Sequence, residues 1–329
     1  MNVLQDKLGR VIRDLRISIT DRCNFRCTYC LPEGVVARPH GEILTFEETA
    51  RLVRLLVALG VDKVRVTGGE PLLRRNAPRL LAMIATIRGV ADLALTTNGW
   101  FVPHLIDDIK ASGVQRLNIS IDSLRRDRFR QMTGVDALPQ VLEGIEAAVR
   151  AGFSPLKLNC VVIRGENDDE VADFADFALA GGHAMRFIEF MPLDSGRTWD
   201  RAKMVPGQEV LARIAERHRL VPLPSRAAAE TAARYAFAAG GEAEIGIIAP
   251  VTAPFCGRCN RVRVTADGKL RTCLFSTVEH DLMAGLRGGW SDEALTRRII
   301  DIVHHKEPGH RINEPGFEVP SRTMSRIGG

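Results

Sequence analysis

Short strand-like runs alternate with longer helical patterns through the first two-thirds of the chain, and this alternation limits the fold more than any other feature. The expected strands are Leu15–Thr20, Lys63–Thr67, Leu93–Thr97, Arg116–Ile121, Leu156–Ile163 and Met185–Phe190. Amphipathic stretches such as Phe46–Leu59, Ala77–Ile87 and Asp168–Ala180 separate them. Such alternation is typical of βαβ units with parallel strands. We therefore predict an α/β fold built on an incomplete (β/α)6 TIM-type barrel, with an open doubly wound sheet as the alternative.

The strands carry polar residues at every second position, which is unusual for parallel strands buried on both faces. Arg16, Ser18 and Thr20 alternate in the first strand, and Arg65 and Thr67 in the second. The pattern continues through Thr96, Asn98, Asn118, Ser120, Asp122, Lys157 and Asn159. Because successive strand residues point to opposite faces, each strand offers an apolar face to the helices and a polar face to the barrel interior. Packed barrels fill this interior with Val, Ile and Leu, so we predict a ligand-lined interior here.

Three cysteines follow the first expected strand, at Cys23, Cys27 and Cys30. An iron–sulfur cluster usually has four cysteine ligands, so three would leave one iron of a cubane open to a small molecule. The alternative is a structural zinc site with a distant fourth ligand, although zinc ligands usually come in closely spaced Cys-x2-Cys pairs. The loop follows the carboxyl end of a strand, which is the catalytic end of such barrels.

A second set of three cysteines, Cys256, Cys259 and Cys273, lies in the last third of the chain. The first two lie on one loop, and Cys273 lies on the far arm of a predicted hairpin. One interpretation is a zinc ribbon whose fourth ligand is His280 or His310. The other is a second cubane with an open iron that binds substrate.

Cysteines grouped in this way, in a chain without a signal-peptide core, indicate metal binding rather than disulfides. The seventh cysteine, Cys160, lies in an apolar strand and is interpreted as a buried inert thiol. No apolar run approaches the roughly 18 residues that a membrane-spanning helix needs. We therefore predict a cytoplasmic protein that does not enter the membrane.

Basic residues lie singly inside strands rather than in one tail, and the net charge is only +5. This distribution favours an anionic small molecule over a nucleic acid as the ligand. The converging cations are Arg16, Arg65, Lys157, Arg186, Arg261 and Arg263. Because arginine suits phosphate oxygens, a triphosphate would explain so many cations in one interior. An ordinary exposed strand face is the alternative for Arg261 and Arg263.

A domain boundary is expected within residues 200–225, where Pro206, Pro222 and Pro224 interrupt a helix-like segment, and we place it at residue 220. Residues 1–220 are predicted to form the partial barrel. Residues 221–329 are predicted to form a smaller C-terminal α+β region that carries the second cysteine set and contributes to ligand binding. Strand-like runs at Glu244–Pro250, Asn260–Thr265 and Lys269–Phe275 favour this interpretation.

Four features together resemble the GTP 3′,8-cyclase family of the radical S-adenosylmethionine (SAM) superfamily, which acts first in molybdenum cofactor biosynthesis. They are Cys-x3-Cys-x2-Cys with Tyr29 before its last cysteine, Gly68-Gly69-Glu70-Pro71 after the second strand, the second cysteine set, and the C-terminal Gly328-Gly329. The resemblance runs from Gly9 to the last residue. It implies a lyase-class enzyme whose Gly-Gly tail reaches into the active site.

The resemblance also implies roles for individual residues. Cys23, Cys27 and Cys30 would bind a 4Fe-4S cluster whose open iron chelates SAM. The second cysteine set would bind another 4Fe-4S cluster, whose open iron meets the guanine ring of GTP. The SAM-contacting positions are Tyr29, Gly69, Ser120 and Met191. The GTP-contacting positions are Arg16, Arg65, Thr96, Lys157, Arg261, Val262 and Arg263.

The implied reaction converts GTP to (8S)-3′,8-cyclo-7,8-dihydroguanosine 5′-triphosphate. A 5′-deoxyadenosyl radical from SAM abstracts the ribose C3′ hydrogen, and the carbon radical attacks C8 of guanine. The implied partners are an electron donor such as flavodoxin or ferredoxin and, through the pathway, cyclic pyranopterin monophosphate synthase; a monomer or homodimer is expected. The alternatives are another radical SAM enzyme that uses the second cluster only for electron transfer, and a zinc-stabilised binding module without redox chemistry.

Overall fold

The computed structural model describes residues 3–31, 35–193 and 199–328. Its strands are β1 (Asp14–Ser18), β2 (Lys63–Thr67), β3 (Asp92–Thr97), β4 (Arg116–Ser120), β5 (Lys157–Val162), β6 (Ala184–Glu189), β7 (Leu220–Leu223), β8 (Ala233–Phe237), β9 (Glu244–Ile248), β10 (Arg261–Val264), β11 (Lys269–Arg271) and β12 (His280–Asp281). The α-helices are α1 (Phe46–Ala58), α2 (Ala77–Ala85), α3 (Val102–Ala111), α4 (Arg126–Thr133), α5 (Leu138–Arg150), α6 (Val171–Gly181), α7 (Gly207–Ala215), α8 (Met283–Arg287), α9 (Asp292–His304) and α10 (Met324–Ile327). Short 3-10 helices lie at His40–Glu42, Pro71–Leu73, Asp168–Glu170, Arg201–Lys203 and Cys256–Arg258.

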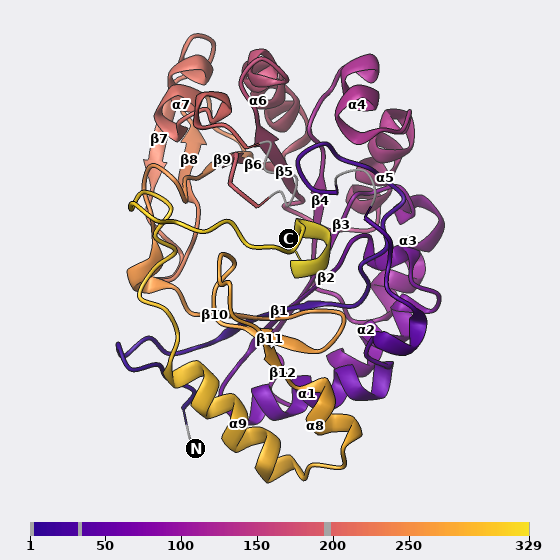
Figure 1. Ribbon diagram of the computed structural model, residues 1–329. Helices are drawn as coiled ribbons and strands as arrows, with labels where there is room; N and C mark the ends of the chain where they lie inside the picture. Colours follow the sequence, from indigo (N-terminus) through magenta and orange to yellow (C-terminus); the bar gives the residue numbers. More distant parts are fainter. Residues whose placement is uncertain (1–2, 32–34, 194–198, 329) are drawn as a thin grey trace.

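In the described residues the strands form one 12-stranded sheet in the order β12-β11-β10-β1-β2-β3-β4-β5-β6-β9-β8-β7. Strands β1 to β6 are parallel neighbours in chain order. The sheet curls around a central space, and helices α1 to α7 lie on its outside (Figure 1). The predicted incomplete barrel is thereby confirmed, and the open doubly wound sheet is excluded because all these helices cover one face.

The C-terminal strands extend the barrel at both of its edges. β10 pairs in parallel with β1, and β9 pairs in parallel with β6. The antiparallel strands β11 and β12 then follow β10, while β8 and β7 follow β9. Residues from both sides of position 220 therefore share one sheet, and the division of the chain into 1–220 and 221–329 stays a prediction.

Alternation within each strand separates the core from the barrel interior. In β1, the side chains of Leu15 and Ile17 are fully buried in the core, whereas Arg16 between them lines the interior. Helix α1 begins at a capping box, in which Thr45 accepts the Glu48 amide and Glu48 accepts the Thr45 amide. Its apolar face then packs against the same core. The helices therefore cover the apolar face of the sheet and leave the polar face for a ligand.

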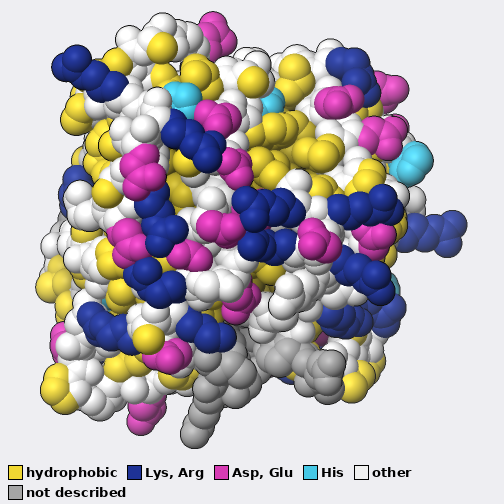
Figure 2. Space-filling view, turned by 90° about the horizontal axis from the view of Figure 1, so that it is seen from above, with side chains coloured by type: hydrophobic (Ala, Val, Ile, Leu, Met, Phe, Trp, Pro, Cys, Tyr) yellow, Lys and Arg dark blue, Asp and Glu magenta, His cyan; other side chains and the backbone are white. Residues whose placement is uncertain are grey.

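The outer surface carries charges of both signs. On the face seen from above Figure 1, Lys and Arg side chains are interspersed with Asp and Glu (Figure 2). Surface arginines form ion pairs, as between Arg125 and Asp169 at 2.9 Å and between Arg217 and Asp173 at 2.7 Å. None of the helices in the described ranges is both long enough and apolar enough to cross a bilayer.

Candidate active site

The first cysteine set occupies the loop after β1, at the carboxyl end of the barrel strands. The Cys30 amide donates to the Cys27 carbonyl at 3.0 Å, which closes the loop into a turn. Burial raises the pKa of the Cys23 thiol to about 11 and that of Cys30 to about 12, and it also raises the pKa of Cys27. The three thiols are close enough for a charge on one to oppose a charge on another. Bound iron would relieve this repulsion, because its positive charge stabilises the thiolates.

The spacing of the thiols bears on the choice between zinc and an iron–sulfur cluster. Across the described ranges, no three Cys, His, Asp or Glu side chains are grouped closely enough to hold one metal ion. That search includes His280 and His310, the candidate fourth ligands of a zinc ribbon. A zinc ion requires its ligands around one atom, whereas each cysteine of a cubane binds a different iron atom. Three cysteines in each set match the ligand number of a cubane with one open iron, and a cluster at the second set stays a prediction.

Tyr29, which precedes the last cysteine of this loop, is anchored beyond the end of β4. Its hydroxyl donates to Oδ2 of Asp122 at 2.7 Å, and Asp122 Oδ1 accepts the Val161 amide of β5 at 2.9 Å. Asp122 is buried, and this burial raises its pKa to about 6. The pair therefore ties the cysteine loop to β4 and β5.

The Gly-Gly-Glu-Pro turn after β2 packs directly against the cysteine loop. A Cβ atom on Gly69 would lie only 2.2 Å from the carbonyl oxygen of Arg22, so a larger residue does not fit. Glu70 is fully buried and accepts the Asn98 amide at 2.7 Å and the Thr97 hydroxyl at 2.8 Å. The turn thereby joins the carboxyl ends of β1, β2 and β3 into one rim.

The second cysteine set lies at the opposite end of the barrel interior. Cys256 and Cys259 precede β10, and Cys273 follows β11. Because β10 runs parallel to β1, with Val262 beside Leu15, the loop before β10 lies near the amino end of β1. The first cysteine set follows the carboxyl end of that strand. β1 has five residues, so roughly 15 Å of strand lies between the two sets.

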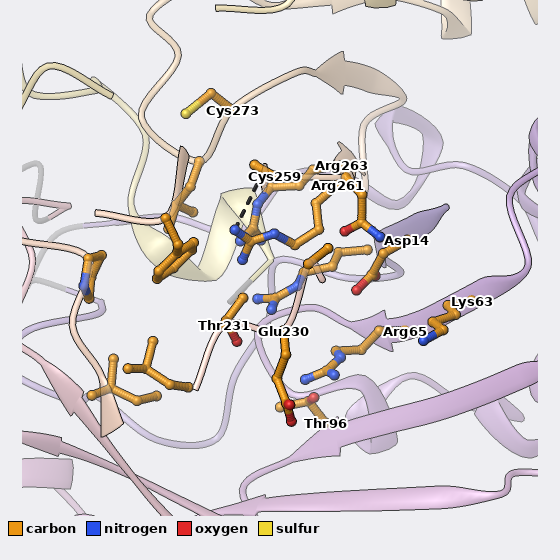
Figure 3. A pocket seen from close by; sticks show the side chains of 18 of the residues that line it. Asp14, Lys63, Arg65, Thr96, Glu230, Thr231, Cys259, Arg261, Arg263 and Cys273 are labelled. Carbon is orange, nitrogen blue, oxygen red and sulfur yellow. Dashed lines mark hydrogen bonds between the residues drawn. The ribbon is translucent and has the colours of Figure 1, made fainter. Parts of the chain in front are cut away.

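Positive charges surround the second cysteine set. Arg261 Nη2 donates to the sulfur of Cys259 at 3.4 Å, the contact drawn as a dashed line in Figure 3. Burial acts to raise the pKa of Cys259, but the charges of Arg261 and Lys306 outweigh it and lower this pKa to about 7. Burial raises the pKa of Cys273. The electropositive setting favours the thiolate that a metal needs.

A cavity of about 440 Å³ fills the barrel interior and reaches the second cysteine set (Figure 3). Side chains of the barrel strands line it: Arg16, Arg65, Thr96, Lys157, Asn159, Arg186, Arg261 and Arg263. Later segments add Glu230, Thr231, Phe275, His310 and Met324. The volume lies in the range of sites for small molecules and cofactors.

Strand register gathers the arginines of this cavity. Arg263, Arg16 and Arg65 occupy paired positions on β10, β1 and β2, so their side chains project from the same face of the sheet. No acidic residue separates them in this row. In the adjacent row, by contrast, Arg261 is paired with Asp14.

The cations of the cavity outnumber its carboxylates, which belong to Asp14, Asp92 and Glu230. Among the residues that the structure describes, no carboxylate lies within the 4 Å ion-pair distance of Arg16, Arg65, Lys157, Arg186, Arg261 or Arg263. The charges of Asp14, Asp92 and Glu230 nevertheless act on several of these cations. The Nε atoms of Arg16, Arg65 and Arg261 are buried without an acceptor. Burial and neighbouring cations lower the pKa of Arg16, and they bring the pKa of Arg263 to about 9 and that of Lys157 to about 7. Buried like charges oppose one another, so this interior is suited to a polyanion.

Known proteins are similar to this chain along almost its whole length. The model for the radical SAM superfamily matches residues 17–178, and that for Molybdenum Cofactor Synthesis C matches residues 183–312. The GTP 3′,8-cyclase of Geobacter sulfurreducens is 45% identical over 328 residues, covering 99% of each chain. That of Syntrophomonas wolfei is 44% identical over 325 residues, covering 98% of this chain and 99% of the other. The chain belongs to the GTP 3′,8-cyclase family.

The barrel of this member of the GTP 3′,8-cyclase family is also found among solved structures. Streptococcus suis SuiB bound to S-adenosylmethionine superposes with a TM-score of 0.62 and 13% identity, covering 88% of this chain and 68% of that chain. At this identity the likeness shows the fold alone. Membership of the radical SAM superfamily implies SAM and a 4Fe-4S cluster as cofactors.

The positions that the GTP 3′,8-cyclase resemblance assigns to SAM all lie at carboxyl ends of barrel strands. Tyr29 follows β1, Gly69 follows β2, Ser120 ends β4 and Met191 follows β6. Met191 also lines the cavity, so this rim and the cavity are continuous there. The individual SAM contacts stay predictions.

Of the positions assigned to GTP, all but Val262 line the cavity. Arg16, Arg65, Thr96, Lys157, Arg261 and Arg263 line the cavity. The side chain of Val262 is instead fully buried in the core, because Val262 lies between Arg261 and Arg263 on β10 and points to the opposite face of the sheet. Any contact that Val262 makes with GTP therefore involves its main chain, and the GTP contacts as a whole stay predictions.

The C-terminal tail enters the same interior. Met324 lines the cavity, and the guanidinium of Arg263 donates to the Gly328 carbonyl. A Cβ atom on Gly328 would lie 3.0 Å from the Thr67 side chain and 3.1 Å from that of Ser18. The tail therefore packs against the carboxyl ends of β1 and β2. Gly329 lies outside the described residues.

Sequence reasoning missed two basic residues that hold the second cysteine set. Arg10 donates to the Cys256 carbonyl at 2.9 Å, from 246 positions away. Lys306 donates to the Arg261 carbonyl at 3.1 Å, from 45 positions away. No motif marks either residue, because each contact depends on chain segments that meet only in the folded protein.

Proposed function

We propose that this protein is a radical SAM GTP 3′,8-cyclase that converts GTP to (8S)-3′,8-cyclo-7,8-dihydroguanosine 5′-triphosphate in molybdenum cofactor biosynthesis. One observation carries the proposal: a single cavity combines an excess of cations with the second cysteine set, and the first cysteine set follows the carboxyl end of β1, a strand that lines this cavity. The cations suit a triphosphate, and the thiols suit a metal centre that meets the base.

Two cofactors, a 4Fe-4S cluster and SAM, would supply the radical chemistry. Cys23, Cys27 and Cys30 would hold the first 4Fe-4S cluster, with SAM between Tyr29 and the glycine-rich turn. When bound and reduced, this cluster and SAM supply a 5′-deoxyadenosyl radical that takes the C3′ hydrogen of the ribose. At the rim, Gly69 packs so closely against the cysteine loop that a side chain at this position would clash with the loop.

The second cysteine set would hold a second 4Fe-4S cluster. Cys256, Cys259 and Cys273 all line the cavity, so an iron left open by three ligands would face the substrate. Its contact with guanine would fix one end of GTP. This cluster is proposed on the same number of cysteines as the first, supported by the positive charges of Arg261 and Lys306 near Cys259.

The chain itself binds the triphosphate and orients the nucleotide. Each charge-assisted hydrogen bond from Arg16, Arg65 or Arg263 contributes roughly 1.5–3 kcal/mol. A bound polyanion would also relieve the repulsion that lowers the pKa of these cations. Fixing GTP at both ends holds C3′ and C8 in a near-attack geometry, which is the main contribution of the protein to the reaction.

The proposal extends to partners and location. A small electron donor such as flavodoxin or ferredoxin would reduce the first cluster, and the product would pass to cyclic pyranopterin monophosphate synthase. The mixed charge of the surface in Figure 2 agrees with a protein that binds its anion inside the barrel rather than on its exterior. We propose a cytoplasmic monomer or homodimer.

The test is the yield of 5′-deoxyadenosine from anaerobically reconstituted protein reduced with dithionite and supplied with SAM. GTP, ATP and no nucleotide are compared, and nucleotide products are identified by mass spectrometry. We expect strong stimulation by GTP alone, together with a cyclised nucleotide. Equal slow turnover in all three would remove GTP as the substrate. Stimulation by GTP without a cyclised product would favour a different radical SAM reaction that uses the second cluster for electron transfer.

The low pKa of Lys157 predicts that GTP affinity depends on pH. Burial, followed by Arg186, Arg116 and Arg65, lowers this pKa to about 7, and a bound triphosphate would raise it again. Binding therefore takes up a proton above this value, and affinity should fall roughly tenfold between about pH 7 and 8.5. Anaerobic equilibrium binding of GTP without SAM measures this effect.

The matched control for this pH dependence is Lys157→Arg, whose guanidinium stays charged throughout. Titration of the phosphates themselves is common to both proteins, so only the difference between them reports on Lys157. Equal pH profiles in the two proteins would show that Lys157 does not contact the triphosphate.

A further inference from the structure

Lys306 is a buried lysine at the second cysteine set that the proposed function does not use. It follows α9, and its side chain is only 2% exposed. Nζ donates to the Arg261 carbonyl at 3.1 Å and also to the Thr272 carbonyl. Arg261 lies two residues after Cys259, and Thr272 directly precedes Cys273. One ammonium group therefore joins both chain segments that carry the cysteines.

In the described part of the chain Lys306 forms no ion pair. Burial acts to raise the pKa of the neighbouring Glu307 carboxyl, but the charge of Lys306 helps to lower it. The neighbouring carboxylate of Glu307 accepts the Thr272 hydroxyl at 2.5 Å and forms no ion pair with Lys306. A buried ammonium is unfavourable unless hydrogen bonds and nearby negative charge compensate for the loss of water. The charge of Lys306 also acts on the thiols of Cys259 and Cys273.

Arg10 provides an internal contrast, because it is a second buried cation beside the same cysteine set. Arg10 Nε contacts Asp6 Oδ2 at 2.5 Å, so its charge is already balanced. Its remaining hydrogens bind the carbonyls of Cys256 at 2.9 Å, Glu307 at 2.6 Å and Pro308 at 3.1 Å. Arg10 is therefore a main-chain clamp with its own ion pair, whereas Lys306 binds main-chain carbonyls and forms no direct ion pair among the described residues.

We infer that Lys306 is a positioning residue that supplies a fixed positive charge to the second iron–sulfur cluster and raises its reduction potential. The inference rests on the proposed second cluster. One electron from a reductant takes a 4Fe-4S centre from the 2+ to the 1+ state and adds one negative charge to the site. A buried positive charge stabilises the more negative state, and net charge is one of the factors that set cluster potentials. Lys306 would thereby make electron transfer into the cluster more favourable.

The test measures the potential of the second cluster alone. Cys23, Cys27 and Cys30 are replaced by alanine in the full-length chain, so that reconstituted iron reports only the second site. In this background Lys306→Met and Lys306→Gln remove the charge, and the amide of glutamine keeps a donor for the main chain. Iron content and a dithionite titration followed by electron paramagnetic resonance are compared with the parent. We expect full iron content and a lower potential in both variants.

Two further variants keep the result decisive. Lys269→Met removes one positive charge from β11 at an exposed ion pair with Asp281, and it should leave the potential unchanged. Lys306→Arg restores the charge. If the neutral variants lose iron, retention by Lys306→Arg supports a requirement for charge, whereas loss in all three assigns Lys306 to packing and overturns the inference.

An unchanged reduction potential in Lys306→Met and Lys306→Gln proteins that retain their iron would also overturn the inference. Failure of the proposed function is recognised separately. A parent that binds no iron at the second cysteine set removes the second cluster and the inference together. If the reduction potential responds to Lys306 as expected but the wild-type protein does not cyclise GTP, only the proposed substrate is wrong.

Discussion

Gly69→Ala is expected to abolish binding of the first iron–sulfur cluster and, with it, cleavage of SAM. The added Cβ atom would lie 2.2 Å from the Arg22 carbonyl oxygen and 2.6 Å from its carbon. Both are main-chain atoms, and Arg22 directly precedes Cys23, so relief of the clash moves the cysteine loop. Overpacking of this kind costs about 1–3 kcal/mol or more. We expect at least about a tenfold loss of 5′-deoxyadenosine yield, since about 1.4 kcal/mol corresponds to a factor of ten.

The measurement combines iron content after anaerobic reconstitution with 5′-deoxyadenosine yield. Gly41→Ala is the matched control, because a Cβ atom there meets nothing within 4 Å. Gly257→Ala is a second control inside the other cysteine loop, where the space is also open. Normal SAM cleavage by Gly69→Ala would show that the cysteine loop moves freely and that the close approach is not required.

Cys273→Ser is expected to abolish formation of the cyclised nucleotide while SAM cleavage continues. Cys273 belongs to the set at the far end of the cavity, roughly 15 Å of strand from the first set, so its loss leaves the SAM site intact. Removal of one of three ligands should release the second cluster, because serine is a poor substitute for a thiolate. GTP would then be held only by its phosphates, and C8 would no longer be fixed near C3′.

Iron content, 5′-deoxyadenosine and cyclised nucleotide are measured on the same sample. Cys160→Ser is the control, since Cys160 is a buried thiol outside both sets. It should keep the iron of both sites and the cyclised product. Normal product from Cys273→Ser would contradict the role assigned to the second cluster. Loss of SAM cleavage together with product would instead indicate that the two ends of the barrel are not independent.

Local patterns predicted the elements of the barrel closely. The helix expected at Phe46–Leu59 forms at Phe46–Ala58, because Thr45 and Glu48 make a capping box at its start. The strand expected at Lys63–Thr67 has these same bounds. The helix expected at Asp168–Ala180 begins instead as a 3-10 turn and continues as α6. These features depend on neighbouring residues, so they can be inferred without a fold.

Side-chain direction was predictable within a strand but not between strands. Alternation placed Arg16 and Arg65 on the polar face, and the cavity contains both. The pairing of β10 with β1 had no local signal, because a four-residue run does not specify its neighbour. That pairing sets Arg263 beside Arg16 and completes the row of cations.

The sequence by itself determined the chemistry available to this protein: two sets of three thiols, a polar face on each barrel strand, and a glycine-rich turn beside a cysteine loop. The tertiary structure decided how these parts are arranged. It placed the two cysteine sets at opposite ends of one interior, set Arg263 beside Arg16, and brought Arg10 and Lys306 to the second set. The physical reason is that residue type and spacing determine local geometry and chemistry. Strand pairing and the environment of a buried charge depend instead on contacts between segments far apart in the chain.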